Sequence, residues 1–105
     1  MLKEADLKKI FNDKKEIFLT TSFKALGDIN RHRIFQLLSV RSRMSAGDIA
    51  KTLKISRPLA SQHLKILEQA KLFTKEKIGQ NKFYRVNKEN IFAKILIGII
   101  LKNIA

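Results

Sequence analysis

The chain has 105 residues, with 22 Lys and Arg against 9 Asp and Glu, and no cysteine. This length predicts one domain spanning residues 1–105, and the cysteine count excludes disulfides, thiolate metal ligands and a thiol redox switch. The formal charge of +13 indicates a polyanionic partner, although charge alone does not separate DNA from RNA or an anionic membrane.

Residues 1–26 begin with mixed charges and without the apolar core of a signal peptide, so we expect a cytoplasmic protein. Two short helical patterns follow, separated by a break near Asn12 and Asp13. The first pattern places three apolar side chains on one side, Leu7, Ile10 and Phe11. The second repeats apolar residues at i, i+4 and i+7, namely Leu19, Phe23 and Leu26. These sides predict helices that pack against another surface.

Residues 45–53 predict a helix that Ser45 caps, with Asp48 completing a capping box. Its apolar positions recur at helical spacing and form one stripe, Ala46, Ile49, Ala50 and Leu53. After a tight turn, a second helix is expected over 57–69, with Ser56 as its N-cap and Pro58 in its first turn. Two helices joined in this way form a helix-turn-helix.

The second of these helices has one apolar and one polar side. Ala60, Leu64 and Leu67 share the side that we expect to be buried. The opposite side carries short hydroxyls, an amide and two cations, at Ser56, Arg57, Ser61, Gln62 and Lys65. Such side chains suit the major groove of DNA, where Gln and Arg form paired hydrogen bonds with base edges. The alternative for this side is an ordinary solvated surface.

Residues 72–86 change to an extended pattern, with two runs rich in Phe, Tyr, Thr and Val around a turn that contains Gly79. A hairpin directly after such a helix is a wing. Its polar side chains suit phosphates or the neighbouring minor groove: Lys75, Lys77, Gln80, Asn81, Lys82 and Arg85. The alternative is a strand edge that lysines protect from aggregation. Residues 29–86 carry 13 basic and 3 acidic side chains, a net +10, so the charge excess coincides with these elements.

Residues 88–105 predict a helix that Asn87 caps and that is apolar on nearly all sides. Lys94 and Lys102 leave an uncharged run well short of the roughly 20 residues that a bilayer requires, so we expect no membrane partner. A small domain cannot cover so wide an apolar surface, so we expect a homodimer in which 1–26 and 88–105 are dimerisation helices. The predicted interface residues are Leu7, Ile10, Phe11, Ile91, Ile95, Leu96, Ile99 and Ile100.

Two segments of the chain resemble motifs of the ArsR/SmtB winged-helix repressors. Residues 28–38 resemble the segment D-x-x-R-x-x-I-x-x-L-L, and residues 56–67 resemble S-x-x-x-S-x-H-L-x-x-L. The resemblance extends from about Phe23 to Val86 and implies a mainly α fold with a small β-hairpin, in the order α-α-α-α-α-β-β-α. It also implies a homodimer that binds an inverted repeat in double-stranded DNA and blocks transcription until an inducer weakens binding.

The resemblance, together with the polar side of the second helix, predicts the DNA contacts. They are Ser45, Ser56, Arg57, Leu59, Ser61, Gln62, His63 and Lys65 on the two helices, and Lys77, Gln80 and Lys82 on the wing. We also expect His63 to be a half-buried, hydrogen-bonding residue of the second helix.

The chain departs from the metal-sensing members of this family. Ser45, Ala46 and Gly47 stand where many members carry a Cys-x-Cys pair, and the last helix has only Glu89 where zinc or nickel sensors carry His and carboxylate ligands. The chain has only two histidines, His32 and His63, so we expect no metal site and no cofactor. The inducer stays unidentified.

The sequence indicates a binding protein rather than an enzyme. It contains no recognisable nucleophile and base pair, phosphate-binding glycine loop or carboxylate cluster. The leading hypothesis is a sequence-specific DNA-binding transcriptional regulator that acts as a homodimeric repressor. The alternatives are a winged-helix adaptor between proteins and a non-specific nucleic-acid binder. The central net charge of +10 favours DNA, because an adaptor does not require it.

Overall fold

The computed structural model describes residues 3–104, so residues 1, 2 and 105 of the predicted domain lie outside it. Its elements follow the predicted order, with one additional turn of 3-10 helix after the first helix. In chain order they are α1 (Glu4–Leu7), η1 (Lys8–Ile10), α2 (Asp13–Leu26), α3 (Ile29–Val40), α4 (Ala46–Leu53), α5 (Arg57–Gln69), β1 (Phe73–Ile78), β2 (Asn81–Val86) and α6 (Ile91–Lys102). The predicted fold class, mainly α with one hairpin, is confirmed.

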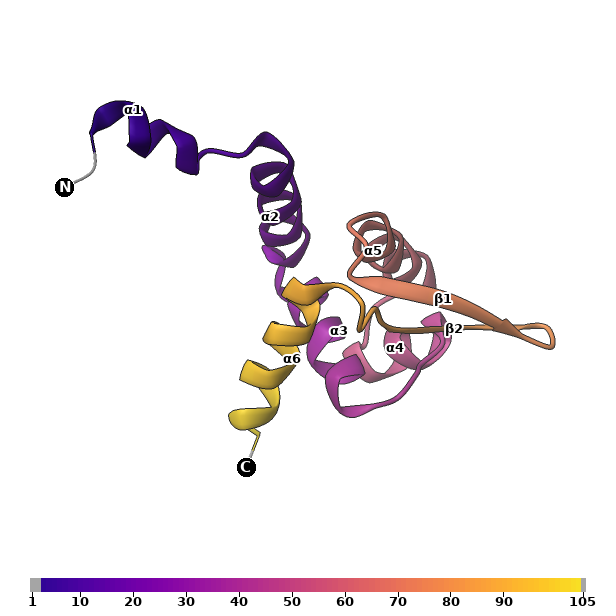
Figure 1. The fold of residues 1–105 in the computed structure, drawn as a ribbon. Helices are drawn as coiled ribbons and strands as arrows, with labels where there is room; N and C mark the ends of the chain where they lie inside the picture. Colours follow the sequence, from indigo (N-terminus) through magenta and orange to yellow (C-terminus); the bar gives the residue numbers. More distant parts are fainter. Residues whose placement is uncertain (1–2, 105) are drawn as a thin grey trace.

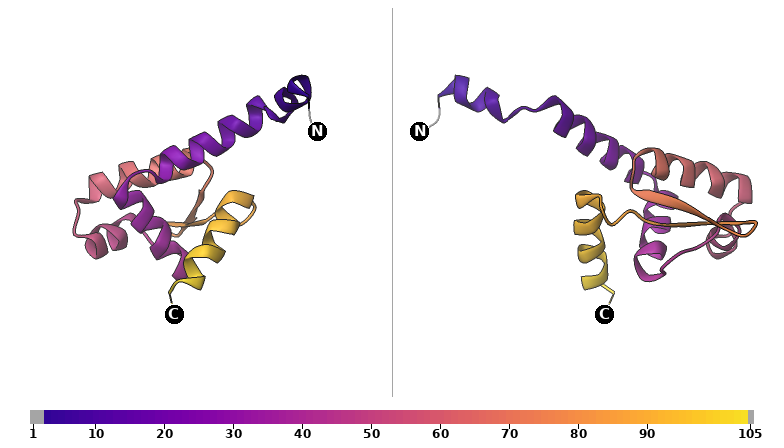
Figure 2. Two further views of the ribbon diagram at one scale, coloured as in Figure 1. Left: turned by 90° about the vertical axis from the view of Figure 1, so that its left-hand side faces the viewer. Right: turned by 45° about the vertical axis from the view of Figure 1, so that its right-hand side comes forward.

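Helix α3 lies at the centre of the molecule. Helices α4 and α5 and the hairpin lie on one side of it, and α6 lies on the other (Figure 1; Figure 2). Ile34 and Phe35 of α3 are completely buried, and the ring of Phe35 stacks on Phe73 at the base of the hairpin with centroids 5.8 Å apart. Leu64 and Leu67 of α5 belong to the same core. The core therefore joins the helix-turn-helix to the hairpin.

Short polar side chains begin the helices. Asn12 accepts a hydrogen bond from the Lys15 amide, which confirms the predicted break before α2. Ser45 accepts one from the Asp48 amide at 3.1 Å, and Ser56 accepts one from the Leu59 amide at 3.2 Å. These bonds satisfy amides that lack partners in the first turn of a helix.

The predicted cap of the last helix is wrong by three residues. Asn90 caps α6 by accepting a hydrogen bond from the Ala93 amide. Asn87 instead donates its side-chain amide to the Lys71 carbonyl and accepts a hydrogen bond from the Glu89 amide. Asn87 therefore closes a turn before the helix, and the helix begins after Asn90.

The hairpin strands pair in antiparallel register from Phe73 opposite Val86 to Ile78 opposite Asn81. The two-residue turn between them uses Gly79, whose φ of +62° is in the left-handed region that glycine adopts without steric strain. Met44 adds a further bridge, because its amide and carbonyl exchange hydrogen bonds with Tyr84 at 3.1 and 2.8 Å. The segment before α4 is thereby attached to the wing.

Lys54 ends α4 with φ 57° and ψ 45°, a left-handed conformation that is unfavourable for a residue with a Cβ atom. We expect Lys54→Gly to raise the free energy of unfolding by about 0.5–1 kcal/mol, after the greater flexibility of the unfolded glycine chain is subtracted. Urea titration monitored by circular dichroism measures the change. As a control, Lys51→Gly inside α4 should lower stability by about 1 kcal/mol, and equal losses in both variants would contradict the interpretation.

The two ends of the chain expose much apolar surface. Leu7, Ile10 and Phe11 lie on the arm formed by α1 and η1, which projects away from the body (Figure 1), and they are 46%, 70% and 65% exposed. On α6, Ile91, Ile95 and Ile99 are also exposed, whereas Leu96 is half-buried against the core.

Ile100 was predicted in the dimer interface, but the single chain already buries most of its side chain. Its side chain is only 8% exposed and belongs to the core of the single chain. Within residues 3–104, no helix is both long and apolar enough to cross a membrane.

Candidate nucleic-acid interface

Helix α5 presents a polar side that the fold leaves free. Ala60, Leu64 and Leu67 are completely buried, which orients the helix. Ser61, Gln62 and Lys65 consequently lie on the exposed side, and Arg57 is exposed at its N-terminal end. The Ser56 hydroxyl caps the helix, so it holds the first turn in place as well as lying at the surface. Exposed amide, hydroxyl and basic groups on one side of a helix have the chemistry that reads base edges.

The predicted contact residues fall into three groups. Ser56, Arg57, Ser61, Gln62, Lys65, Lys77, Gln80 and Lys82 are all exposed. Leu59 is 36% exposed and Ser45 is half-buried with its hydroxyl committed to the cap of α4. His63 is only 7% exposed, so it does not belong to the exposed side that the other predicted contacts form.

His63 connects α5 to the start of α3. Its Nδ1 lies 3.2 Å from a terminal guanidinium nitrogen of Arg31. Because arginine only donates hydrogen bonds, Nδ1 accepts and the neutral ring carries its proton on Nε2. Nε2 lies 3.9 Å from Oδ1 of Asp28. Arg31 also donates through Nε to the Ala25 carbonyl, so one arginine joins α2, α3 and α5.

Asp28 lies at the other end of this cluster, beside Nε2 of His63. Its carboxylate caps α3 by accepting hydrogen bonds from the amides of Asn30 and Arg31 at 2.8 and 3.1 Å. The Arg31 amide is the main reason that the pKa of Asp28 lies below its ordinary value, with the Arg31 charge and the Asn30 amide adding to the effect and burial opposing it. The lowered pKa means that Asp28 stabilises the fold above its ordinary pKa and loses that contribution as the pH falls through its folded value.

The sequence contains the two segments that form this cluster, but nothing in it indicates that they lie in contact. Arg31 and His63 are separated by 32 positions, and each belongs to one of the two family-like segments. The cluster therefore gives those segments a structural role, which is to fix α5 on α3.

The wing adds positive charge on the side that faces α5. The register places Lys75 and Lys77 on the same side as the buried Phe73, with Lys82 directly opposite Lys77. Lys75 lies 3.7 Å from Glu68 of α5, which shows that this side turns toward the helix. Among residues 3–104, neither Lys77 nor Lys82 has a carboxylate within ion-pair distance.

Two adjacent ammonium groups on paired strands repel each other, and a polyanion relieves that repulsion.

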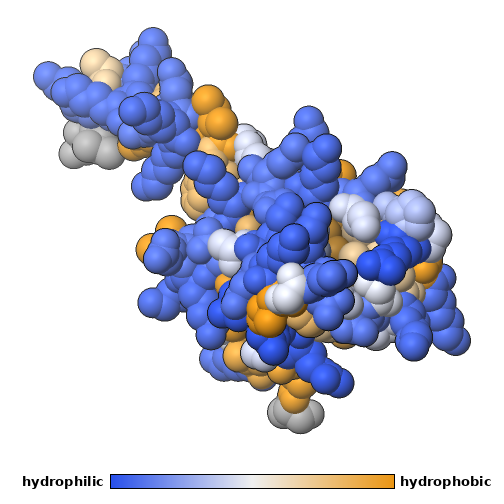
Figure 3. Space-filling view, turned by 90° about the vertical axis from the view of Figure 1, so that its right-hand side faces the viewer, coloured by the Kyte–Doolittle hydropathy of each residue, from blue (hydrophilic) through white to orange (hydrophobic). Residues whose placement is uncertain are grey.

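The other side of the wing is electrically balanced near its base, where Arg85 forms an ion pair with Glu76. Arg43 lies over the ring of Phe83, 4.9 Å from its centroid, and the sequence prediction did not include it. The surface seen from the wing tip is mostly hydrophilic (Figure 3). Within the described part of the chain, no three His, Cys, Asp or Glu residues gather as a metal site would require.

Comparison with known proteins connects this geometry to a family. Residues 26–76 match a family model described as a helix-turn-helix domain. The chain is 43% identical over 65 residues to the transcriptional repressor SdpR of Bacillus subtilis, covering 62% of this chain and 71% of that protein. It is 36% identical over 69 residues to the arsenical resistance operon repressor of the same organism, covering 66% of each. These relatives are transcriptional regulators rather than enzymes.

Solved structures agree with the relatives. An ArsR-like transcriptional regulator from Rhodococcus sp. RHA1 superposes with a TM-score of 0.67 and 30% identity, covering 85% of each chain. HlyU from Vibrio cholerae N16961 gives a TM-score of 0.76 over 87% of this chain and 96% of that one, and at 24% identity this likeness shows the fold alone. A helix-turn-helix followed by a basic wing, in a chain with these relatives, identifies the protein as a member of the ArsR family of winged-helix transcriptional regulators.

Proposed function

We propose that the protein is a homodimeric transcriptional repressor that binds an inverted-repeat operator in double-stranded DNA. The observation that carries the proposal is the exposed polar side of α5 beside Lys77 and Lys82 of the wing. In this proposal, α5 reads base edges in the major groove while the wing contacts the phosphates or the adjacent minor groove. The two relatives named as repressors support repression as the outcome. We also propose that the protein acts in the cytoplasm, as the sequence predicts.

The exposed apolar surface at the chain ends supports the dimer. Ile91, Ile95 and Ile99 follow one another at intervals of four on α6, so they form one stripe that the single chain leaves uncovered. Contiguous apolar surface of this kind marks an interface between proteins. In the proposed arrangement, residues 1–105 form one domain and residues 1–26 and 88–105 supply the dimer contacts. A two-fold dimer presents two copies of α5, which explains why the operator would be an inverted repeat.

Single substitutions distinguish side chains that read base edges from side chains that contact the phosphates. Gln62→Ala should lose about 1–3 kcal/mol of discrimination at one base pair of each half-site, because a paired hydrogen bond with that base edge disappears. Lys82→Ala should instead weaken binding to all duplexes alike. It should also reduce the slope of log affinity against log salt concentration by about one, because one phosphate contact is lost. Fluorescence anisotropy with the operator, single-base variants and a scrambled duplex at two salt concentrations measures both.

Gln69→Ala serves as the control. Gln69 is exposed at the C-terminal end of α5, and its loss should leave all affinities unchanged. If Gln62→Ala and Lys82→Ala lost affinity equally on every duplex, the assigned roles would be wrong.

A further inference from the structure

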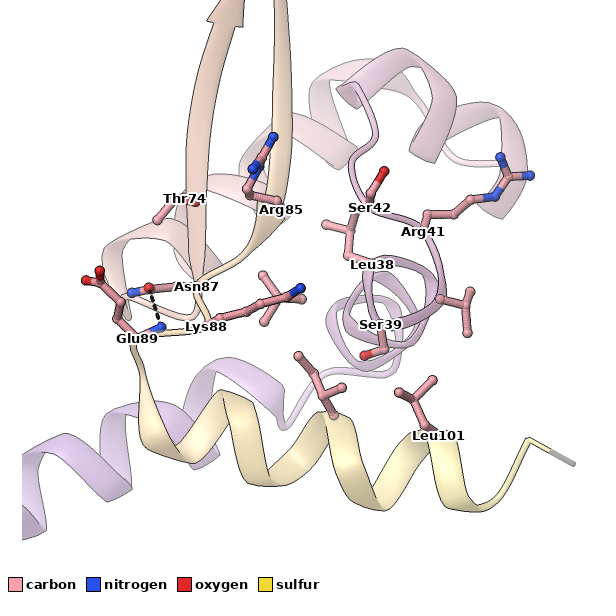
Figure 4. Close-up of a pocket in the computed structure, with 13 residues that line it drawn as sticks. Leu38, Ser39, Arg41, Ser42, Thr74, Arg85, Asn87, Lys88, Glu89 and Leu101 are labelled. Carbon is pink, nitrogen blue, oxygen red and sulfur yellow. Dashed lines mark hydrogen bonds between the residues drawn. The ribbon is translucent and has the colours of Figure 1, made fainter.

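A groove with a volume of about 700 Å³ lies between the end of α3, the base of the wing and α6 (Figure 4). Its size is typical of ligand sites, which enclose roughly 300–1,000 Å³. Leu38, Ile97 and Leu101 give it an apolar wall, and Thr74 and Lys88 lie on the opposite rim. The groove is separate from the exposed side of α5, and the proposed DNA contacts do not use it.

The groove combines this apolar wall with a positive charge. Figure 4 shows Lys88 extending into the groove toward Leu38, whereas Glu89 points away from it. Among the residues that the structure describes, Lys88 has no carboxylate within ion-pair distance, while Arg85 is already paired with Glu76. An uncompensated ammonium beside aliphatic side chains matches a molecule that carries one anionic group on an apolar body.

The backbone that presents Lys88 is held in place on both sides. The Asn87 side chain donates to the Lys71 carbonyl at 3.0 Å and accepts from the Glu89 amide at 3.2 Å. Asn90 donates to the same carbonyl of Lys71 at 2.9 Å while it caps α6. Lys71 itself has a positive φ of 62°, so the chain turns sharply where α5 meets the wing. The segment that carries Lys88 therefore connects α5, the wing and α6 through one carbonyl group.

The groove and the apolar stripe occupy different sides of α6. Ile97 and Leu101 follow Ile95 and Ile99 by two residues, which corresponds to about 200° around a helix. A molecule in the groove would therefore leave the stripe of Ile91, Ile95 and Ile99 free for a second copy. It would contact α6, the end of α3 and the base of the wing at once.

We propose that this groove binds a small organic anion with an apolar body, such as an aromatic or medium-chain carboxylate, and that its occupancy changes DNA affinity. Lys88 binds the anionic group, and Leu38, Ile97 and Leu101 contact the apolar body. The occupied groove fixes the base of the wing relative to α6, so the position of Lys77 and Lys82 depends on the ligand. The second half of this inference rests on the proposed DNA-binding function.

The binding half is tested without DNA. In amide NMR spectra of the full chain titrated with 1-naphthoate, the shifts should centre on Leu38, Asn87 and Leu101. Lys88→Glu should weaken binding at least about tenfold, because an opposite charge faces the carboxylate. Lys51→Glu is the matched control: it makes the same charge change at an exposed position on α4, remote from the groove, and binding should be unchanged. The uncharged 1-naphthalenemethanol should bind much more weakly than the acid.

Three results of this titration would overturn the proposal. They are an absence of shifts, shifts centred on Ile95 and Ile99, and equal binding of the acid and the alcohol. For the second half, the operator is first obtained by selecting random duplexes with the protein. Saturating 1-naphthoate should change the affinity for that operator at least about fivefold in the unaltered protein and not in Lys88→Glu. An unchanged affinity in the unaltered protein would overturn the regulatory role. The NMR titration does not depend on whether the protein recognises an operator, so the two proposals fail separately.

Discussion

Replacing Ile95 and Ile99 together by Glu is expected to produce a monomer that binds the operator at least about 100-fold more weakly. The two side chains are 60% and 55% exposed in the single chain, so the substitution should leave the monomer folded. In a dimer they would lose contact with water, and burying carboxylates there without partners is strongly unfavourable. Linking two DNA-reading units raises affinity by about 10²–10⁴ through effective concentration, and the monomer would lose that gain.

Sedimentation equilibrium gives the oligomeric state of this double variant, and anisotropy gives its DNA affinity. Ile29→Glu provides the control, because Ile29 is 60% exposed at the start of α3 and lies outside the proposed interface. The control should remain a dimer with ordinary affinity. A double variant that stays dimeric, or a monomer that binds the operator fully, would contradict the assignment of α6 to the interface.

Phe35→Ala is expected to lower the free energy of unfolding by about 3–5 kcal/mol. Phe35 is completely buried at the centre of α3 and stacks on Phe73, so its removal leaves a cavity between α3 and the base of the wing. This is a large part of the roughly 5–15 kcal/mol by which a domain of this size is stable. Operator binding should therefore decrease at temperatures where the unaltered protein stays folded.

Urea titration monitored by circular dichroism tests this expectation. Phe23→Ala is the matched control, since Phe23 is 61% exposed and makes one edge-to-face contact with Phe92 at a centroid distance of 5.3 Å. Its loss should be about 1 kcal/mol. Similar losses in the two variants would show that the contact between α3 and the wing is not the centre of the core.

The elements of the DNA-binding half were predictable because their signals are local. Ser45 and Ser56 stand directly before apolar helical repeats, and each forms the expected cap. Gly79 between two strand-like runs marked the turn of the wing, and its positive φ provides the reason. Local backbone preference and side-chain period decide such features, so one sequence is sufficient to find them.

Features that depend on contacts across the chain were not predictable in the same way. Asn87 and Asn90 are both good caps by residue type, and both donate to the Lys71 carbonyl. They differ in the amide they accept from: Asn87 closes a turn with Glu89, and Asn90 caps α6 at Ala93. Ile100 lies on a helix that is apolar on nearly all sides, so periodicity does not distinguish its buried side from its exposed one. His63 matched a motif, but it is buried and contacts Arg31, which is remote in sequence.

The residues with positive φ and the groove beside Lys88 also depend on contacts across the chain, so local sequence signals do not predict them. Lys54 and Lys71 adopt positive φ although lysine has no preference for that conformation, because the packing of α5 determines the turns at both of its ends. The groove beside Lys88 forms from α3, the wing and α6, and no single segment contains its pattern.

Selection of random duplexes by the full-length protein tests the central claim most directly. Anisotropy titration of the enriched sequence and of a scrambled control, at two salt concentrations, should follow the selection. The account predicts an enriched inverted repeat with half-sites about one helical turn apart, bound at least about 10³-fold more tightly than the scramble. An absence of enrichment, with an affinity that only decreases as salt rises, would contradict it and indicate a non-specific polyanion binder or an adaptor.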